Sequence, residues 1–165
     1  MIALIALLAL VVAAPLAFAQ SRGGGAPEPI PDEPFTLEGA RNPVGAQCTF
    51  DVFVEPSGST KEIDVPERRG EAERKIFIFP AAMYTLTNED TGEQVTLNVT
   101  GASHQTTLEN GDVVTVVTGL NLLGDPQAGF VLAQGDFSFT FDAEGNLTEP
   151  LHGTGQLTDV CALLS

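Results

Sequence analysis

The chain has 165 residues, of which 22 are Asp or Glu and 7 are Lys or Arg, and its formal net charge at pH 7 is −15. Nucleic acids and anionic membrane surfaces attract Lys and Arg, so this composition argues against both as partners and leaves cations, basic proteins and neutral ligands open. The two cysteines lack the close spacing of a cysteine-based metal site, which argues against a structural zinc centre.

Residues 1–19 are typical of an export signal. They contain no charged side chain, and Ala17-Phe18-Ala19 supplies the small-x-small pattern that a signal peptidase cuts, although the basic residues usual at the start of such a signal are missing. The alternative is an uncleaved membrane anchor, but Pro15 interrupts the apolar run, and a spanning helix needs about 20 predominantly apolar residues. We therefore expect cleavage before Gln20, a secreted or cell-envelope location, and no membrane association afterwards.

Residues 20–46 combine three consecutive glycines with five prolines and few apolar positions. A segment of this composition cannot bury enough apolar surface to offset the entropy lost on ordering, so we expect a flexible linker. Phe35 and Leu37 are the exceptions that could dock on the domain that follows. Residues 47–165 have the length of one ordinary domain with its own core.

From residue 48 onward, apolar residues recur at alternate positions, which is typical of antiparallel strands with one buried face. Runs of this kind, or β-branched and aromatic runs without strict alternation, occupy residues 48–54, 75–79, 83–87, 95–100, 113–118, 130–134 and 137–141. The run at 75–79 is apolar on both sides, so we expect it to be central or covered. Asn110-Gly111 is the strongest turn signal, because both central positions of a type I′ hairpin turn need positive φ.

These runs predict an all-β domain, an antiparallel meander of about eight to ten strands. A meander of that size avoids exposed edges most simply by forming a closed or nearly closed barrel, and the alternative is a sandwich of two packed sheets. Helix is predicted only near the C-terminus, where Thr158 or Asp159 could cap a short turn, and the alternative there is a final strand. The helical turn would place three apolar residues against the sheet: Val160, Leu163 and Leu164.

Residues 66–75 are expected to form an exposed loop, because this charged stretch offers no apolar face to bury. Arg68, Arg69 and Arg74 make it the basic cluster of an acidic chain. Two interpretations follow, a loop that contacts a partner and a loop that is only solvated. The second is the commoner use of such a run.

Cys48 and Cys161 bracket nearly the whole predicted domain. In an exported chain with two cysteines the economical assignment is one disulfide between them, and the alternative is two free, buried thiols. Closing a loop of about 100 residues stabilises the folded state by about 4.7 kcal/mol in the chain-entropy model. The pairing predicts that the first strand of the domain and the C-terminal segment are neighbours.

Catalytic candidates are few. His104 and His152 are the natural general acids or bases, because imidazole titrates near neutral pH. Ser103 precedes His104, but neighbours in a strand point to opposite faces and cannot act together. The motifs G-x-S-x-G, S-x-x-K and H-E-x-x-H do not occur. The remaining candidates are His104 and Tyr84, should either face a barrel interior beside an acidic residue such as Asp51, so the sequence favours a protein without catalytic activity.

Two acidic turns, 88–92 and 142–146, carry oxygen ligands beside a glycine, as calcium loops do. Neither has the full calcium loop with its terminal bidentate Glu, and both lie where hairpin turns are expected, so we predict no metal site and no cofactor. Asn98 and Asn146 begin Asn-x-Thr glycosylation acceptors, and both matches would be accidental in a bacterial protein.

Residues 120–130 are the segment least explained by strand or turn requirements alone. They could form a lid over one end of a barrel, where ligands enter such folds. The alternative is a wide connection whose apolar side chains fill that end. The residues that would contact an apolar small molecule under the lid hypothesis are Leu122, Leu123, Phe137 and Phe139.

The runs NLLGDPQAG, FDAEGN and GQLTDVCALL resemble stretches of uncharacterised secreted proteins of high-GC Gram-positive bacteria, over roughly residues 48–164. The motifs carry no assigned chemistry, so the resemblance implies a location and a single β domain rather than an activity. At the level of fold alone, the expected meander also resembles calycin or allene oxide cyclase-type barrels, which bind or cyclise apolar molecules, and this likeness transfers no residues.

The sequence therefore favours a secreted, acidic, non-catalytic β domain that acts as a binding or cell-surface interaction module. Its partner would be a protein or an apolar small molecule. Two alternatives remain, a barrel isomerase or cyclase that acts on an apolar small molecule, and a structural protein of the cell envelope.

Overall fold

Antiparallel strands make up most of the part of the chain that the computed structural model describes, which is residues 26–30, 33–39, 48–65 and 72–165. The predicted leader at 1–19 lies outside it. The described elements are β1 (Glu28–Pro29), β2 (Phe35–Leu37), β3 (Val52–Ser57), β4 (Ser59–Val65), β5 (Glu73–Ile78), β6 (Met83–Asn88), β7 (Gln94–Asn98), β8 (Gly101–Thr107), β9 (Val113–Asp125), β10 (Gly129–Phe141), β11 (Leu147–Asp159) and α1 (Val160–Leu163). The all-β prediction is therefore confirmed.

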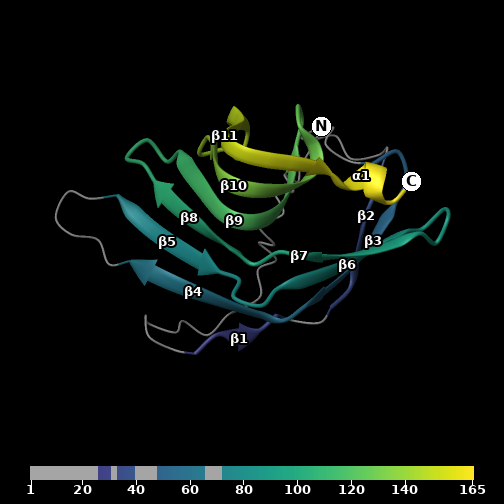
Figure 1. Ribbon diagram of the computed structural model, residues 1–165. Helices are drawn as coiled ribbons and strands as arrows, with labels where there is room; N and C mark the ends of the chain where they lie inside the picture. Colours follow the sequence, from purple (N-terminus) through teal and green to yellow (C-terminus); the bar gives the residue numbers. More distant parts are fainter. Residues whose placement is uncertain (1–25, 31–32, 40–47, 66–71) are drawn as a thin grey trace, which may run out of the picture.

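The strands form two antiparallel sheets, and neither closes into a barrel. One sheet has the order β1-β4-β5-β8-β9-β10-β11 and the other the order β2-β3-β6-β7 (Figure 1). The predicted barrel is thus wrong and the sandwich alternative describes the fold better. The physical reason is that the chain changes sheets between β1 and β2, between β3 and β4, between β5 and β6, and between β7 and β8. As a result, β5 pairs with β8 rather than with its successor.

The change of sheet between β3 and β4 depends on a glycine. Gly58 has a φ of 105°, a conformation that side-chain-bearing residues rarely adopt, and the Ala81 carbonyl lies where its Cβ would be. Its own carbonyl accepts a hydrogen bond from the amide of Ile30 at 3.0 Å, which holds the segment containing β1 at the corner. Sequence reasoning had no means of distinguishing this corner from an ordinary hairpin turn.

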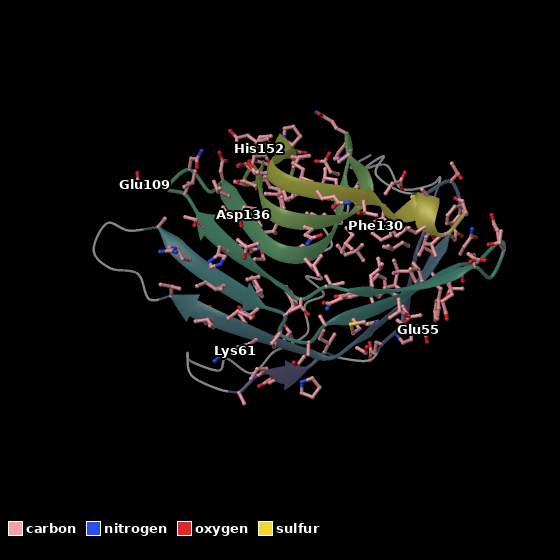
Figure 2. The ribbon with its side chains drawn as sticks, in the orientation of Figure 1. Glu55, Lys61, Glu109, Phe130, Asp136 and His152 are labelled. Carbon is pink, nitrogen blue, oxygen red and sulfur yellow. A yellow bond between two sulfur atoms is a disulfide. The ribbon has the colours of Figure 1, made fainter. Side chains whose placement is uncertain are left out.

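The main core lies between the two sheets and is built by alternation. In β6, Tyr84, Leu86 and Asn88 are buried while the residues between them remain partly exposed. The residues of this inter-sheet cluster come from both sheets and from the C-terminal segment: Leu37, Cys48, Val52, Val54, Ala82, Tyr84, Leu86, Leu97, Val99, Leu122, Phe130, Val160 and Leu164. Figure 2 shows Phe130 between β10 and the smaller sheet. Full burial of each large aliphatic side chain contributes about 1.5–3 kcal/mol, so this layer is the principal source of stability.

A second core cluster lies on the opposite face of β9 and β10. Its buried residues are Val117, Leu123, Val131, Ala133, Phe137 and Phe139. It forms because β9, β10 and β11, each thirteen residues long, curve strongly (Figure 1). Gly119, Gly135 and Gly155 lie opposite one another at the bend. A Cβ on Gly135 would approach the Cα of Gly155 to 2.8 Å, so only glycine permits the backbones to come this close.

Asp125 holds the far end of this bend. Its side chain is 4% exposed, and its Oδ1 accepts hydrogen bonds from the amides of Gln127 and Ala128, both at 2.8 Å. Its Oδ2 accepts from the amide of Leu151 at 2.9 Å. The tip of the β9–β10 hairpin is thereby tied to the beginning of β11. Residues 120–130, expected as a lid or a connection, are instead the ends of two long strands and the tight turn between them.

Part of the predicted linker belongs to the sheets. β1 pairs with β4 at one edge, and β2 pairs with β3 at another, where Leu37 is almost fully buried. The expectation of a flexible linker throughout 20–46 is therefore wrong for these two short strands. Both are edge strands, and the edge of a sheet tolerates the prolines that made this segment resemble a linker. The dockable residues singled out in the sequence, Phe35 and Leu37, both contact the inter-sheet cluster.

The C-terminus folds as a short helix and is held by three interactions. Asp159 caps α1 by accepting a hydrogen bond from the Ala162 amide at 3.2 Å. The predicted disulfide between Cys48 and Cys161 is confirmed, with the two Cα atoms 5.3 Å apart. The Nδ2 of Asn88 donates to the carbonyl of Leu164 at 2.9 Å. Across the described ranges, no helix reaches the length and hydropathy that crossing a bilayer demands.

Two details of the predicted turns differ from the structure. Leu163 is 43% exposed rather than packed against the sheet, whereas its neighbour Leu164 is fully buried. At Asn110-Gly111 only the glycine has positive φ, and the Gly111 amide donates to the carbonyl of Leu108 at 2.9 Å. This is a type I turn followed by a glycine bulge rather than a type I′ turn, because the loop is one residue longer than the type I′ turn requires.

Candidate functional site

The strand register separates the histidines and the serine. His104 lies opposite Val116, which lies opposite Ser138, which lies opposite His152. Both histidines are therefore on one face of the larger sheet with two strands between them, a separation of roughly 14 Å at the usual strand spacing. Ser103 is on the other face. These residues do not converge on a common point.

Tyr84 and Asp51 are also placed apart from His104. Tyr84 is buried in the inter-sheet cluster, and this burial raises the pKa of its hydroxyl above its ordinary value. The Oδ1 of Asp51 accepts a hydrogen bond from the Gly39 amide at 2.8 Å, so this carboxylate holds the segment that follows β2. His104 belongs to β8 in the other sheet. The structure thus brings none of the catalytic candidates together.

The four residues proposed to contact a ligand divide between the two core clusters. Leu122 packs in the inter-sheet cluster, whereas Leu123, Phe137 and Phe139 belong to the second cluster. Consecutive residues of a strand point to opposite faces, which explains why the two leucines separate. The ring of Phe139 contacts that of Phe141 edge to face, with centroids 5.6 Å apart. All four residues therefore fill the interior of the protein.

The acidic turns use their oxygens internally. Asp142 Oδ1 accepts from the amides of Glu144 and Asn146, and the Asn146 side chain donates to both carboxylate oxygens. These hydrogen bonds, the one from the Asn146 side chain above all, hold the pKa of Asp142 below its usual value. Asn88 Oδ1 likewise accepts from the amides of Asp90 and Thr91. Within the described ranges, no three His, Cys, Asp or Glu side chains are grouped as metal ligands.

A row of partly exposed side chains, three apolar and one histidine, crosses β4, β5, β8 and β9. Ile63 lies opposite Ile76, Ile76 opposite His104, and His104 opposite Val116, so all four share one face, which we call the outer face. Val116 is 38% exposed, and none of the four belongs to either core cluster. Solvent-facing positions of a sheet are usually polar, so this row is unusual.

The run at 75–79 is the sequence signal for the outer face. It is apolar on both sides, which predicts a central or covered strand. β5 is indeed an inner strand of its sheet, yet Ile76, Phe77 and Ile78 all remain partly exposed. Two-sided apolarity indicates a strand that needs a cover on both faces, and that cover need not belong to the same chain.

The opposite face of the same strands contains a buried hydroxyl without a partner. Ser103 is 3% exposed, lies between Phe77 and Val117 in the register, and its Oγ makes no hydrogen bond to any described residue. Further out on this face, the Nζ of Lys75 lies 3.3 Å from a carboxylate oxygen of Glu62, and this hydrogen bond raises the pKa of the lysine. The pair is half-exposed, so its contribution to stability is small.

Comparison with known proteins assigns no family. None of the protein-family models, characterised proteins or solved structures with which the chain was compared matches it significantly. The candidate site therefore depends on the geometry of this chain alone. That geometry favours the outer face over the dispersed catalytic candidates.

Proposed function

We propose that this chain is a non-catalytic protein-interaction module, secreted or retained at the cell envelope, that binds a protein partner through the outer face. The observation that carries the proposal is the apolar row Ile63, Ile76 and Val116. The histidine His104 lies between Ile76 and Val116 in this row, and partly exposed apolar side chains grouped on one surface mark contact sites for other molecules. The disulfide between Cys48 and Cys161 supports an oxidising compartment.

The outer face suits a flat protein partner better than a small molecule. It is a sheet surface formed by four adjacent strands, and a small molecule needs a concave site that buries most of its area. The isomerase or cyclase alternative requires a polar group inside a barrel. The described sheets form no closed barrel, and His104 and Tyr84 lie in different sheets, so we do not propose it.

Site-specific photocrosslinking in the producing cells tests the proposal. A photoreactive side chain at Val116 samples the outer face, and the same group at Thr85 is the matched control, since Thr85 lies on the solvent face of the smaller sheet. We expect a defined protein adduct at Val116, none at Thr85, and loss of the adduct when Ile76→Asp is introduced. Equal labelling at both positions, or none at Val116, contradicts the proposal. Native mass spectrometry of the purified chain tests the alternative, because a retained small molecule would point to a ligand-binding protein.

A further inference from the structure

The last strand of the larger sheet, β11, has an outer edge that no described strand pairs with along its regular part, from His152 to Asp159. β11 pairs with β10 on one side, and no described strand lies on the other (Figure 1). Residues 152–157 are all exposed. The other edge strands of the two sheets, β1, β2 and β7, have only two, three and five residues. Unpaired amide and carbonyl groups along a long edge are a template for another strand.

The usual protections of a sheet edge are missing from most of β11. Natural proteins place lysines, inward-pointing charges, prolines or bulges on such strands to prevent pairing. Residues 151–158 contain no Lys, Arg, Asp, Glu or Pro. The irregularity in the pairing with β10 lies near the start of β11, beside Glu149, and the register is regular from His152 to Asp159. The regular part of the edge is therefore open to an added strand.

Exposed apolar side chains adjoin this open edge. Leu157 on β11 is 42% exposed, and Leu163 on α1 is 43% exposed. Gly153 and Gly155 precede Leu157 on the same strand and have no side chain, and their positive φ lets the β10 backbone approach closely. An added strand would thus find an apolar contact at Leu157 and room for its own side chains beside the two glycines.

The acidic side chains around the edge favour a basic partner. All seven Lys and Arg residues precede Ile76, so the stretch from Ile76 to the C-terminus contains acidic but no Lys or Arg side chains. Three exposed carboxylates surround the edge: Asp136 beside Thr154, and Glu149 and Asp159 near the two ends of β11. Figure 2 shows Asp136 and His152 on this part of the sheet. A basic segment would be attracted here and an acidic one repelled.

We propose that the outer edge of β11 binds an extended, basic segment of a protein partner, which adds to the larger sheet as a further strand. Main-chain hydrogen bonds would supply the affinity, and the apolar contact at Leu157 and the flanking carboxylates would supply the selectivity. A second copy of this chain is the less suitable occupant, because antiparallel pairing of two β11 strands brings their acidic ends together. The proposal concerns a different surface from the outer face and does not depend on it.

Fluorescence anisotropy with the full chain and two labelled peptides tests the proposal. Both peptides alternate Val and Thr, one between pairs of Lys and the other between pairs of Glu. We expect the Lys-flanked peptide to bind at least about tenfold more tightly, with an affinity that falls as salt is raised. Hydrogen exchange should slow at residues 152–158 when that peptide is bound, and this readout separates edge pairing from attraction to the acidic surface in general.

A variant with two lysines on the edge, Thr154→Lys with Gln156→Lys, provides the second part of this binding test. It should weaken binding of the Lys-flanked peptide by about tenfold or more, because lysine is the residue that natural edges use against pairing. Thr96→Lys on the short edge strand β7 is the matched control and should leave binding unchanged. Equal binding of both peptides, binding of neither, or unchanged hydrogen exchange in β11 overturns the proposal. A dimer in sedimentation that the edge variant abolishes would overturn it in favour of a second copy.

Discussion

Asp125 allows a sharp test of how the bent sheet is held together. Replacing it with Asn keeps the shape of the side chain, but the amide has one acceptor oxygen where the carboxylate has two. The carboxylate accepts from three backbone amides, those of Gln127, Ala128 and Leu151. If the Asn oxygen keeps the turn, its NH₂ group faces the Leu151 amide, and this partly buried donor loses its partner. Losing a hydrogen bond to a charged group and leaving a buried donor unpaired costs about 2 kcal/mol.

Urea unfolding with the disulfide intact measures this cost. We expect Asp125→Asn to lower the free energy of unfolding by about 2 kcal/mol and Asp125→Ala by about 4 kcal/mol, since Ala leaves all three amides unpaired. Hydrogen exchange at the Leu151 amide should accelerate in both variants. Asp142→Asn is the matched control, because that carboxylate also accepts several turn hydrogen bonds but is exposed, and its effect should be clearly smaller. An unchanged free energy of unfolding in Asp125→Asn, with unchanged exchange at Leu151, refutes the assigned role.

Three further predictions concern single features of the core. Ser103→Ala should stabilise the protein by about 1 kcal/mol in urea unfolding, because the buried hydroxyl has no partner in the described structure; a loss of stability would mean that the hydroxyl is hydrogen-bonded. Burial raises the pKa of Tyr84 in the folded state, so its contribution is fully present below the unfolded pKa of about 10 and is lost as pH rises through the folded pKa. Far-ultraviolet ellipticity between about pH 8 and pH 11 should therefore show alkaline loss of structure that is reduced in Tyr84→Phe, and identical profiles would contradict this. Replacing Cys48 and Cys161 together with Ala should lower the free energy of unfolding by about 2–5 kcal/mol, measured against the oxidised chain, and a change below about 1 kcal/mol would show that the cross-link constrains little.

The local sequence was sufficient to predict the elements that a repeated apolar pattern or a covalent bond defines. Alternating apolar residues predicted the strands that cover the core, such as the run at 95–100, because one face of each must be buried. Besides β1 and β2, which lie in the predicted linker, three strands escaped this criterion: β4, β8 and β11. Their exposed or partly exposed faces carry polar residues and glycines, so no apolar alternation marks them. Pairing with adjacent strands makes them strands, and in β8 one of those partners, β5, is not its neighbour along the chain.

The candidate site residues could also be placed only in part from the sequence. Position along a strand was enough to exclude Ser103 and His104 as a pair, because consecutive side chains point to opposite faces. It was not enough to separate His104 from His152, since that requires the order of strands in the sheet. The outer face and the open edge of β11 are likewise properties of strand order. Neither can be found by examining one run of residues at a time.

The sequence by itself determined the apolar strand-forming runs, the all-β class and the disulfide, since each depends on short-range periodicity, residue chemistry or cysteine count, whereas it left a final strand open beside the C-terminal helical turn. Tertiary structure alone decided the sandwich over the barrel, the bend across the glycines, and which strand lies at the edge. These depend on where the chain changes sheets, as at Gly58, and on contacts such as Asp125 with Leu151 that join residues far apart in sequence. Local preferences fix what a segment can become, whereas the packing of all segments together fixes which of its surfaces are left for a partner.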